Sequence, residues 1–232
     1  FVVGALLLLF AFVLSVGYTT LLAVGRRATA AVTAGVPRLA AAGPGQAAPV
    51  LTAAPTPLQG AATAGALAYG LTWAAFLALA GSLLARAMVV ERGPWGNMYE
   101  FSIAFAVGII GGYLFLARRY PIRSIGFLPL GVALFLAGYA ATLPAAIEPL
   151  VPALDNPLLL TVHVAMAMIA YGVLAVSFAA AVGYLAQGEE DRFAWLPSHD
   201  VLDAVAYRSV VIGFPIFATM IILGSYWASI AW

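Results

Sequence analysis

Six apolar stretches, each long enough to cross a lipid bilayer, dominate this sequence. A membrane-spanning helix needs about 20 predominantly apolar residues, and inside lipid the backbone polar groups must find partners within the structure itself. The six stretches are Phe1–Val24, Leu67–Val90, Tyr99–Ala117, Ile125–Leu143, Leu158–Gln187 and Val210–Ile230. The sequence therefore predicts an all-α fold, a polytopic integral membrane helical bundle with six transmembrane helices.

Composition narrows the possible functions. Only 8% of the residues are charged, against about 25% in soluble proteins. The sequence has no cysteine, which excludes disulfides, zinc–thiolate sites, thiol nucleophiles and electron transfer by dithiol exchange. A net charge of +1 gives no reason to expect nucleic-acid binding, so the lipid membrane is the expected environment. The sequence contains no phosphate loop, nucleophile elbow or metal-ligand spacing.

A long segment rich in alanine, proline, glycine and threonine separates the first two apolar stretches. It has no periodic apolar face, so we expect residues 25–66 to form a flexible linker. Residues 1–24 then form the first transmembrane helix, and residues 67–232 form a membrane domain with the other five. The first stretch has no charged region before it and no cleavage site after it, so we do not expect a signal peptide. The sequence begins with Phe1 and not with methionine, so we expect it to start inside a longer protein.

The arginines predict how the bundle is oriented. If the N-terminus lies outside, only Arg86 and Arg92 fall on the outer side. The inner connectors then hold Arg26, Arg27, Arg38, Arg118, Arg119, Arg123, Arg192 and Arg208. This excess of inner positive charge is typical of membrane proteins. It predicts a multi-pass plasma-membrane protein with a cytoplasmic linker and with Phe1 and Trp232 on the extracytoplasmic side.

His163 is the only histidine in a predicted spanning stretch. An ionisable side chain inside such a helix is costly and usually marks a function. At about 1.5 Å per residue it lies roughly 8 Å below the start of its helix, near the outer interface. Two interpretations stay open: a hydrogen bond between helices, or axial ligation of a haem iron, with Met166 packing against the porphyrin edge. One such histidine cannot form a bis-histidine haem site, so a second ligand would come from elsewhere.

The stretch Arg92–Ser102 leads from an outer loop into the third helix. Trp95 and Tyr99 suit anchoring at the membrane interface. Glu100 needs a partner because it enters the membrane as a carboxylate. It could satisfy the positive end of its helix, pair with Arg86 or Arg92, or orient an imidazole as a hydrogen-bond acceptor.

The last stretch carries an aromatic group at its outer end. Gly213 and Pro215 are expected to interrupt its helix near the inner end. Tyr226, Trp227 and Trp232 suit either an aromatic belt or a platform that binds haem.

The polar connector before it contains Ser198, a suitable N-cap. Apolar residues at helical spacing follow it, namely Val201, Leu202 and Val205. This pattern predicts a short amphipathic helix that lies flat on the inner membrane face.

Three motifs resemble the CcsA/ResC/CcsB family of cytochrome c biogenesis proteins, the System II haem-handling branch of the cytochrome c assembly family. They are WGNMYEF (95–101), LLLTVHVAMAMIAYGVL (158–174) and AYRSVVIGFPIFATMIILGSYWASIAW (206–232). The likeness runs in matching order from residue 66 to the C-terminus. It implies that the NxYE segment begins a helix at the outer face and that His163 is an external axial ligand of haem iron. Trp227 and Trp232 match the start of the family's tryptophan-rich, haem-binding WWD loop.

The resemblance also implies a function. Haem b would be transported to, or presented at, the extracytoplasmic face for covalent attachment to the CxxCH thiols of apocytochrome c. Residues 67–232 would be the haem-handling domain, with a ResB-type membrane partner (CcsB in some organisms) in a holocytochrome c synthase complex. The expected haem-binding residues are His163, Trp232, Trp227, Tyr99, Glu100, Trp95 and Met166.

The sequence departs from the family pattern in several places. It stops where the WWD loop would begin, and it lacks the family's second external histidine and its later intramembrane histidine. Leu158 and Leu159 stand where the family commonly has His-Trp. We therefore expect the N-terminal membrane part of a truncated member, inactive by itself.

Two other classes compete with this interpretation. A small-solute transporter or permease subunit would have inverted repeats and helices broken at mid-membrane, but the sequence shows no convincing self-similarity. A structural membrane subunit would use His163 only for a hydrogen bond between helices.

Overall fold

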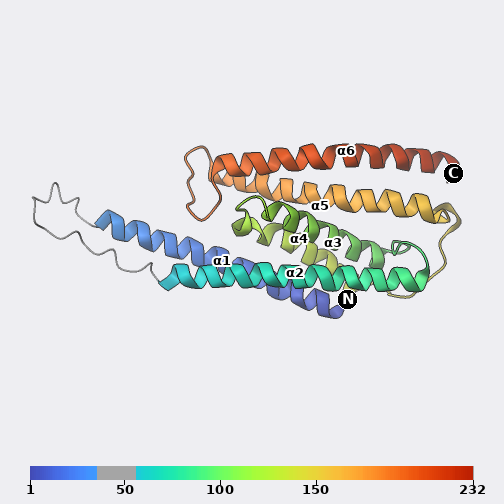
Figure 1. The fold of residues 1–232 in the computed structure, drawn as a ribbon, viewed down its shortest axis with the longest axis horizontal. Helices are drawn as coiled ribbons and strands as arrows, with labels where there is room; N and C mark the ends of the chain where they lie inside the picture. The colour runs from blue at the N-terminus through green and yellow to red at the C-terminus, as the bar shows by residue number, and fades with distance from the viewer. Residues whose placement is uncertain (36–55, 232) are drawn as a thin grey trace, which may run out of the picture.

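The chain forms a bundle of long helices in the computed structural model, which describes residues 1–35 and 56–231 (Figure 1). Its elements are α1 (Val2–Gly35), α2 (Thr56–Val90), α3 (Met98–Ala117), η1 (Arg123–Ile125), α4 (Phe127–Ala141), η2 (Pro152–Leu154), α5 (Pro157–Gln187) and α6 (His199–Ala231). The described residues contain no strand. Six of the described segments are long and apolar enough to cross a membrane, and each overlaps one predicted stretch. The all-α, multi-pass prediction is confirmed.

Helix α3 lies at the centre of the bundle. It packs against α2, α4 and α5, while α1 packs against α2 and α4, and α6 packs against α5. Figure 1 shows α5 and α6 along one side of the α3–α4 pair and α1 and α2 along the other. Half of the twelve largest fully buried side chains lie on α3 and α4, including Ile103, Ile110 and Leu114 of α3. The burial of α3 on several sides explains why it is apolar around its whole circumference.

Close contact between backbones fixes α3 against α5. A Cβ atom on Gly172 would collide with the carbonyl oxygen of Gly108, and one on Gly112 would lie 2.6 Å from that of Gly172. Small residues let spanning helices approach in this way. The contact lies partway along α5, beyond His163, and sets how closely the first turns of α5 approach α3.

Helix occupies both ends of the predicted linker. α1 continues to Gly35, and α2 begins at Thr56. Alanine is the strongest helix former, and extending an existing helix avoids the cost of nucleating a new one. The apolar pattern therefore located the membrane spans without locating the helix ends. Residues 36–55 lie outside the described residues, so the flexible linker remains a prediction there.

The prediction of a separate interfacial helix before the last span was wrong. α6 is one continuous helix of 33 residues, with Pro215 inside it. Its first turns pack along α5, because Leu202 and Val205 are fully buried and Ser177 donates a hydrogen bond to the carbonyl of Ala206 (3.0 Å). The apolar positions that suggested a membrane-surface helix face α5 instead.

The start of α6 follows Ser198, as predicted, but a different side chain caps it. The Asp191 carboxylate accepts the backbone N–H of His199 at 2.7 Å. A carboxylate at this position also complements the positive end of the helix. Pro215 does not interrupt α6, although its ring removes one backbone donor.

The connectors gather at two ends of the bundle. One end, here called the His163 end, contains the 91–97 turn, the 142–156 loop, the start of α5 and the end of α6 (Figure 1). Arg86 and Arg92 lie at this end. At the opposite end, Arg118 lies over the ring of Trp73 (4.5 Å) and Arg123 over that of Tyr69 (4.3 Å). The helices thus alternate in direction, as the arginine pattern requires.

Candidate functional site

His163 lies in the second turn of α5. Asn156 caps this helix by accepting the backbone N–H of Leu159 (3.2 Å), and Pro157 occupies its first turn, where a missing N–H costs nothing. From there the imidazole reaches α6, where its ring lies 5.9 Å from that of Trp227 at an interplanar angle of 68°. The site therefore lies between the start of α5 and the end of α6.

A glycine on α6 makes room for the imidazole. A Cβ atom on Gly224 would lie 2.6 Å from Cε1 of His163 and 3.1 Å from its Nδ1. Real side chains do not approach so closely, so the ring rests directly on the backbone of α6. Gly224 lies three residues before Trp227, which places both on one face of the helix. Sequence reasoning did not identify Gly224, although a glycine one turn from a site tryptophan was an available signal.

Neither nitrogen of His163 has a hydrogen-bond partner among the described residues. Nδ1 is fully buried and unpartnered, the one such side-chain atom found in the described part of the chain. The interhelical hydrogen bond considered for this histidine is therefore not formed between described residues. A buried polar atom without a partner is costly and needs an explanation, such as a missing ligand.

Two cavities meet at His163. One has a volume of about 380 Å³ and lies between the start of α3 and the two helices of the site, with Trp95 and Phe101 in its wall. The other, of about 270 Å³, lies between η2 and the last turns of α6. Both are lined by Leu154, His163 and Trp227. The arrangement is an apolar and aromatic hollow with one imidazole exposed to it, which suits a flat apolar molecule carrying a metal ion.

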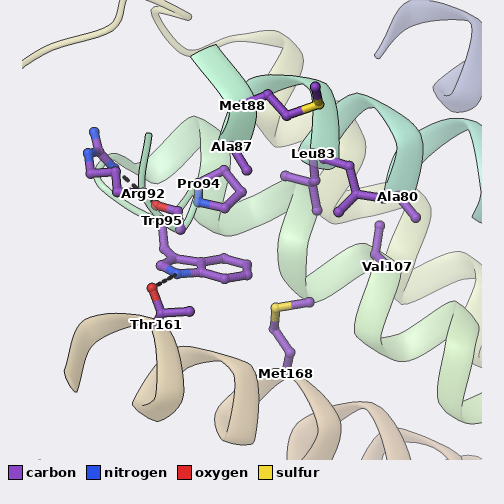
Figure 2. A pocket seen from close by; sticks show the side chains of 12 residues that line it. Ala80, Leu83, Ala87, Met88, Arg92, Pro94, Trp95, Val107, Thr161 and Met168 are labelled. Carbon is purple, nitrogen blue, oxygen red and sulfur yellow. Dashed lines mark hydrogen bonds between the residues drawn. The ribbon is translucent and has the colours of Figure 1, made fainter. Parts of the chain in front are cut away.

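Trp95 forms the wall between the site and a larger cavity. Its indole N–H donates to the Thr161 hydroxyl at 3.4 Å, as Figure 2 shows. Gly93 lies against this pair, since a Cβ there would collide with the indole nitrogen and would come within 2.5 Å of the hydroxyl. The 91–97 turn is thereby fixed to α5 two residues before His163.

Glu100 is fully buried and holds the 91–97 turn in place. Its carboxylate pairs with Arg86 Nε (2.5 Å) and Arg92 Nη1 (3.5 Å) and accepts the backbone N–H of Gly96 (2.7 Å). Its own N–H donates to Asn97 Oδ1 at 2.9 Å, which caps α3. Of the three roles predicted for Glu100, the helix-end and arginine contacts are both present. None of its contacts with the described residues is with an imidazole.

The residues that contact Glu100 also hold the loop that covers the site. Arg86 donates to the carbonyls of Ala145 (2.9 Å) and Ala146 (3.2 Å). Arg92 donates to the carbonyl of Glu148 (3.4 Å), and Asn97 donates to that of Ala146 (3.1 Å). The 142–156 loop, which carries Leu154 into both cavities, is therefore attached to the buried carboxylate.

The structure brings together some of the sequence-predicted site residues. His163, Trp227 and Trp95 share one cavity wall. Tyr99 lies elsewhere, with its ring 5.4 Å from that of Phe1 and 5.3 Å from the Arg86 guanidinium. Met166 is half-buried and is not part of the lining of either cavity. Trp232 lies outside the described residues.

Sequence reasoning missed two residues that line the site. Leu154 comes from the 142–156 loop, and Phe101 follows Glu100 on α3.

Comparison with known proteins gives a consistent result. The family model described as "Cytochrome C assembly protein" matches residues 95–232. The chain is similar to the cytochrome c biogenesis protein CcsA of Guillardia theta, with 28% identity over 171 residues (62% of this chain, 56% of the relative). It is also similar to CcsA of Porphyra purpurea, with 27% identity over 202 residues (67% and 63%), and to CcsA of Gloeothece citriformis, with 26% over 232 residues (75% and 68%).

These matches cover only part of each relative, because the chain spans 56% and 63% of the first two. No solved structure shows a significant match to this chain. The family model nevertheless covers every residue that lines the two His163 cavities, and more than half of the sequence. The chain belongs to the cytochrome c assembly protein family.

Proposed function

We propose that this chain takes part in cytochrome c biogenesis by holding haem b at the His163 end of the bundle. One observation carries the proposal: in a member of a cytochrome c assembly family, a half-buried imidazole, whose buried Nδ1 has no hydrogen-bond partner among the described residues, lies between two apolar cavities. Imidazole is a common axial ligand of haem iron, and iron ligation would use a nitrogen that no described residue occupies.

The residues around His163 fit a porphyrin. Trp227 and Trp95 offer aromatic faces, while Leu154 and Phe101 add apolar surface. Haem is the cargo here, and the chemistry of attachment belongs to the cysteine thiols of the client. This chain has no cysteine, so it offers no thiol that would compete for the vinyl groups. A second axial ligand would come from the client apocytochrome c or from another chain.

The orientation and the partner are parts of the same proposal. The positive-inside rule supports an extracytoplasmic His163 end, because Arg86 and Arg92 are the only basic residues there among the described residues. The plasma membrane is the proposed location, since attachment to the CxxCH thiols occurs outside the cytoplasm. A ResB-type membrane protein and apocytochrome c are the proposed partners.

The geometry does not favour a small-solute transporter. Transporters commonly bind substrate where helices are broken at mid-membrane. The described helices, including α6 with its internal proline, are continuous. The cavities beside His163 lie at one end of the bundle, where α5 begins and α6 ends.

Haem retention tests the proposal. The purified chain should show a Soret band, and His163→Gly should lose most of it and recover it with added imidazole. His199→Gly is the matched control, because His199 stacks on Tyr184 (4.0 Å) at the opposite end of the bundle. Equal haem content and identical spectra for the wild type and His163→Gly would contradict the proposal.

A further inference from the structure

A further apolar cavity is separate from the His163 cavities. It has a volume of about 780 Å³ and lies between α2, the 91–97 turn, α3 and α5 (Figure 2). Its walls are apolar: Leu83, Ala87 and Met88 come from α2, and Met168 comes from α5. Trp95 closes it at the outer end and separates it from the site around His163.

This cavity continues along α3 as a groove. A second cavity of about 370 Å³ shares Val107 and Met168 with the first and extends to Phe76 and Phe115. Along α2 the two cavities reach from Met88 to Phe76, which is about 18 Å at 1.5 Å per residue. One leaflet of a bilayer contributes about 15 Å of hydrocarbon, half of a core about 30 Å thick. The groove therefore has the length of one lipid acyl chain.

The groove opens towards the membrane. Leu84 and Met88 line it and are 67% and 80% exposed, although both lie within a spanning helix. Exposed apolar side chains of such a helix face hydrocarbon. A chain-shaped apolar molecule can therefore enter from the side, without crossing either membrane surface.

A guanidinium lies at the outer end of the groove. Arg92 lines the large cavity, and it is the only charged residue among those that line either cavity. Its Nη1 donates to the carbonyl of Gly93 at 3.1 Å, while its hydrogen bond to the carbonyl of Glu148 (3.4 Å) and its ion pair with Glu100 (3.5 Å) are long. Its Nε has no acceptor among the described residues. A phosphate group is a natural acceptor for these donors.

The surroundings of Arg92 select the headgroup. Glu91 precedes Arg92 in the chain, and Arg92 donates to the backbone carbonyl of Glu148; both glutamates are exposed, and neither lines the groove, while Arg86 pairs with Glu100. Carboxylates beyond the phosphate position disfavour a lipid with net negative charge and favour one whose phosphate is followed by an ammonium group. We propose that this groove binds one phosphatidylethanolamine molecule, with an acyl chain along α3 and the phosphate at Arg92.

Native mass spectrometry of the full chain, released from mixed phosphatidylethanolamine and phosphatidylglycerol membranes, tests the proposal. The wild type should retain one phosphatidylethanolamine. Ala87→Phe fills the groove and should lose most of the bound lipid. Ala66→Phe, on an exposed part of α2 away from the groove, is the matched control and should behave as the wild type. Arg92→Gln should weaken retention roughly tenfold, because it removes a charge-assisted contact.

Several results would overturn the proposal. A wild type that retains no lipid, as expected if another protein fills the groove, would overturn it. Equal retention by Ala87→Phe and Ala66→Phe would do the same, and equal retention of phosphatidylglycerol would overturn the headgroup assignment. The lipid measurement does not depend on haem, since His163 does not line the groove. His163→Gly should therefore keep its lipid, so this proposal and the haem proposal can fail independently.

Discussion

The imidazole of His163 lies edge-on to the indole of Trp227, with ring centroids 5.9 Å apart across the contact between α5 and α6. Both cavities of the site are lined by this pair. Trp227 is thus positioned to contact a molecule that His163 binds from either side.

Trp227→Ala should reduce haem affinity by about fivefold, because an aromatic contact contributes about 1 kcal/mol beyond its buried area. Trp227→Phe should retain most of the affinity, since it keeps a ring at this position. The measurement is a haem titration followed by Soret absorbance. Tyr226→Ala is the control: Tyr226 is the neighbouring aromatic residue, is 58% exposed and lines neither cavity. Equal losses for Trp227→Ala and Tyr226→Ala would show that Trp227 has no special part in binding.

Gly224→Ala should displace the imidazole, because the new methyl group would lie 2.6 Å from Cε1. The ring can move only into the cavities, so we expect haem retention to fall while the helix stays intact. Gly138→Ala on α4 is the control, because no atom lies within 4 Å of its Cβ position. That variant should gain up to about 1 kcal/mol of stability from helix propensity. Wild-type haem content in Gly224→Ala would show that the close contact is not needed.

The sequence predicted the fold better than it predicted the site. Length and apolar character locate the six spans because the bilayer imposes both. The contact of His163 with Gly224 depends on how α5 and α6 are rotated about their axes, and helices that are apolar all round do not reveal this rotation. Tyr99 illustrates the same limit. The sequence places it at the start of α3, near the site, but does not reveal that its ring faces Phe1 and Arg86.

Charged residues were easier to interpret. Glu100 needs a partner because it lies in a membrane helix. The two arginines that the sequence suggested as partners, Arg86 and Arg92, both pair with its carboxylate. The length of α6 could not be predicted in the same way. Its first turns have an amphipathic pattern because their polar side faces water while Leu202 and Val205 pack on α5. The sequence of α6 does not show that α5 supplies this apolar surface.

Glu100→Gln should destabilise the His163 end by about 3 kcal/mol, since it leaves two guanidiniums without their buried carboxylate. We place the cost at the low end of the usual range because Arg86 also donates to the carbonyls of Ala145 and Ala146. The measurement is denaturant unfolding in detergent micelles. Adding Arg86→Gln should recover part of the loss, because one unpaired charge is then removed. Additive losses in the double variant would mean that the two residues are not coupled.

Gly172→Ala should separate α3 from α5, because its methyl group would collide with the carbonyl oxygen of Gly108. Backbone atoms cannot move aside as a flexible side chain can, so we expect a loss of about 3 kcal/mol, the upper part of the range for overpacking. Gly81→Ala on α2 is the control, with no atom within 4 Å of its Cβ position. Unfolding of both variants in micelles gives the comparison. Gly172 lies beyond His163 on α5 and does not touch the haem site. Haem affinity in Gly172→Ala should therefore fall only if the spacing between α3 and α5 also sets the width of the cavity between Trp95 and His163. Unchanged stability would mean that α5 slides or tilts freely against α3 at this point.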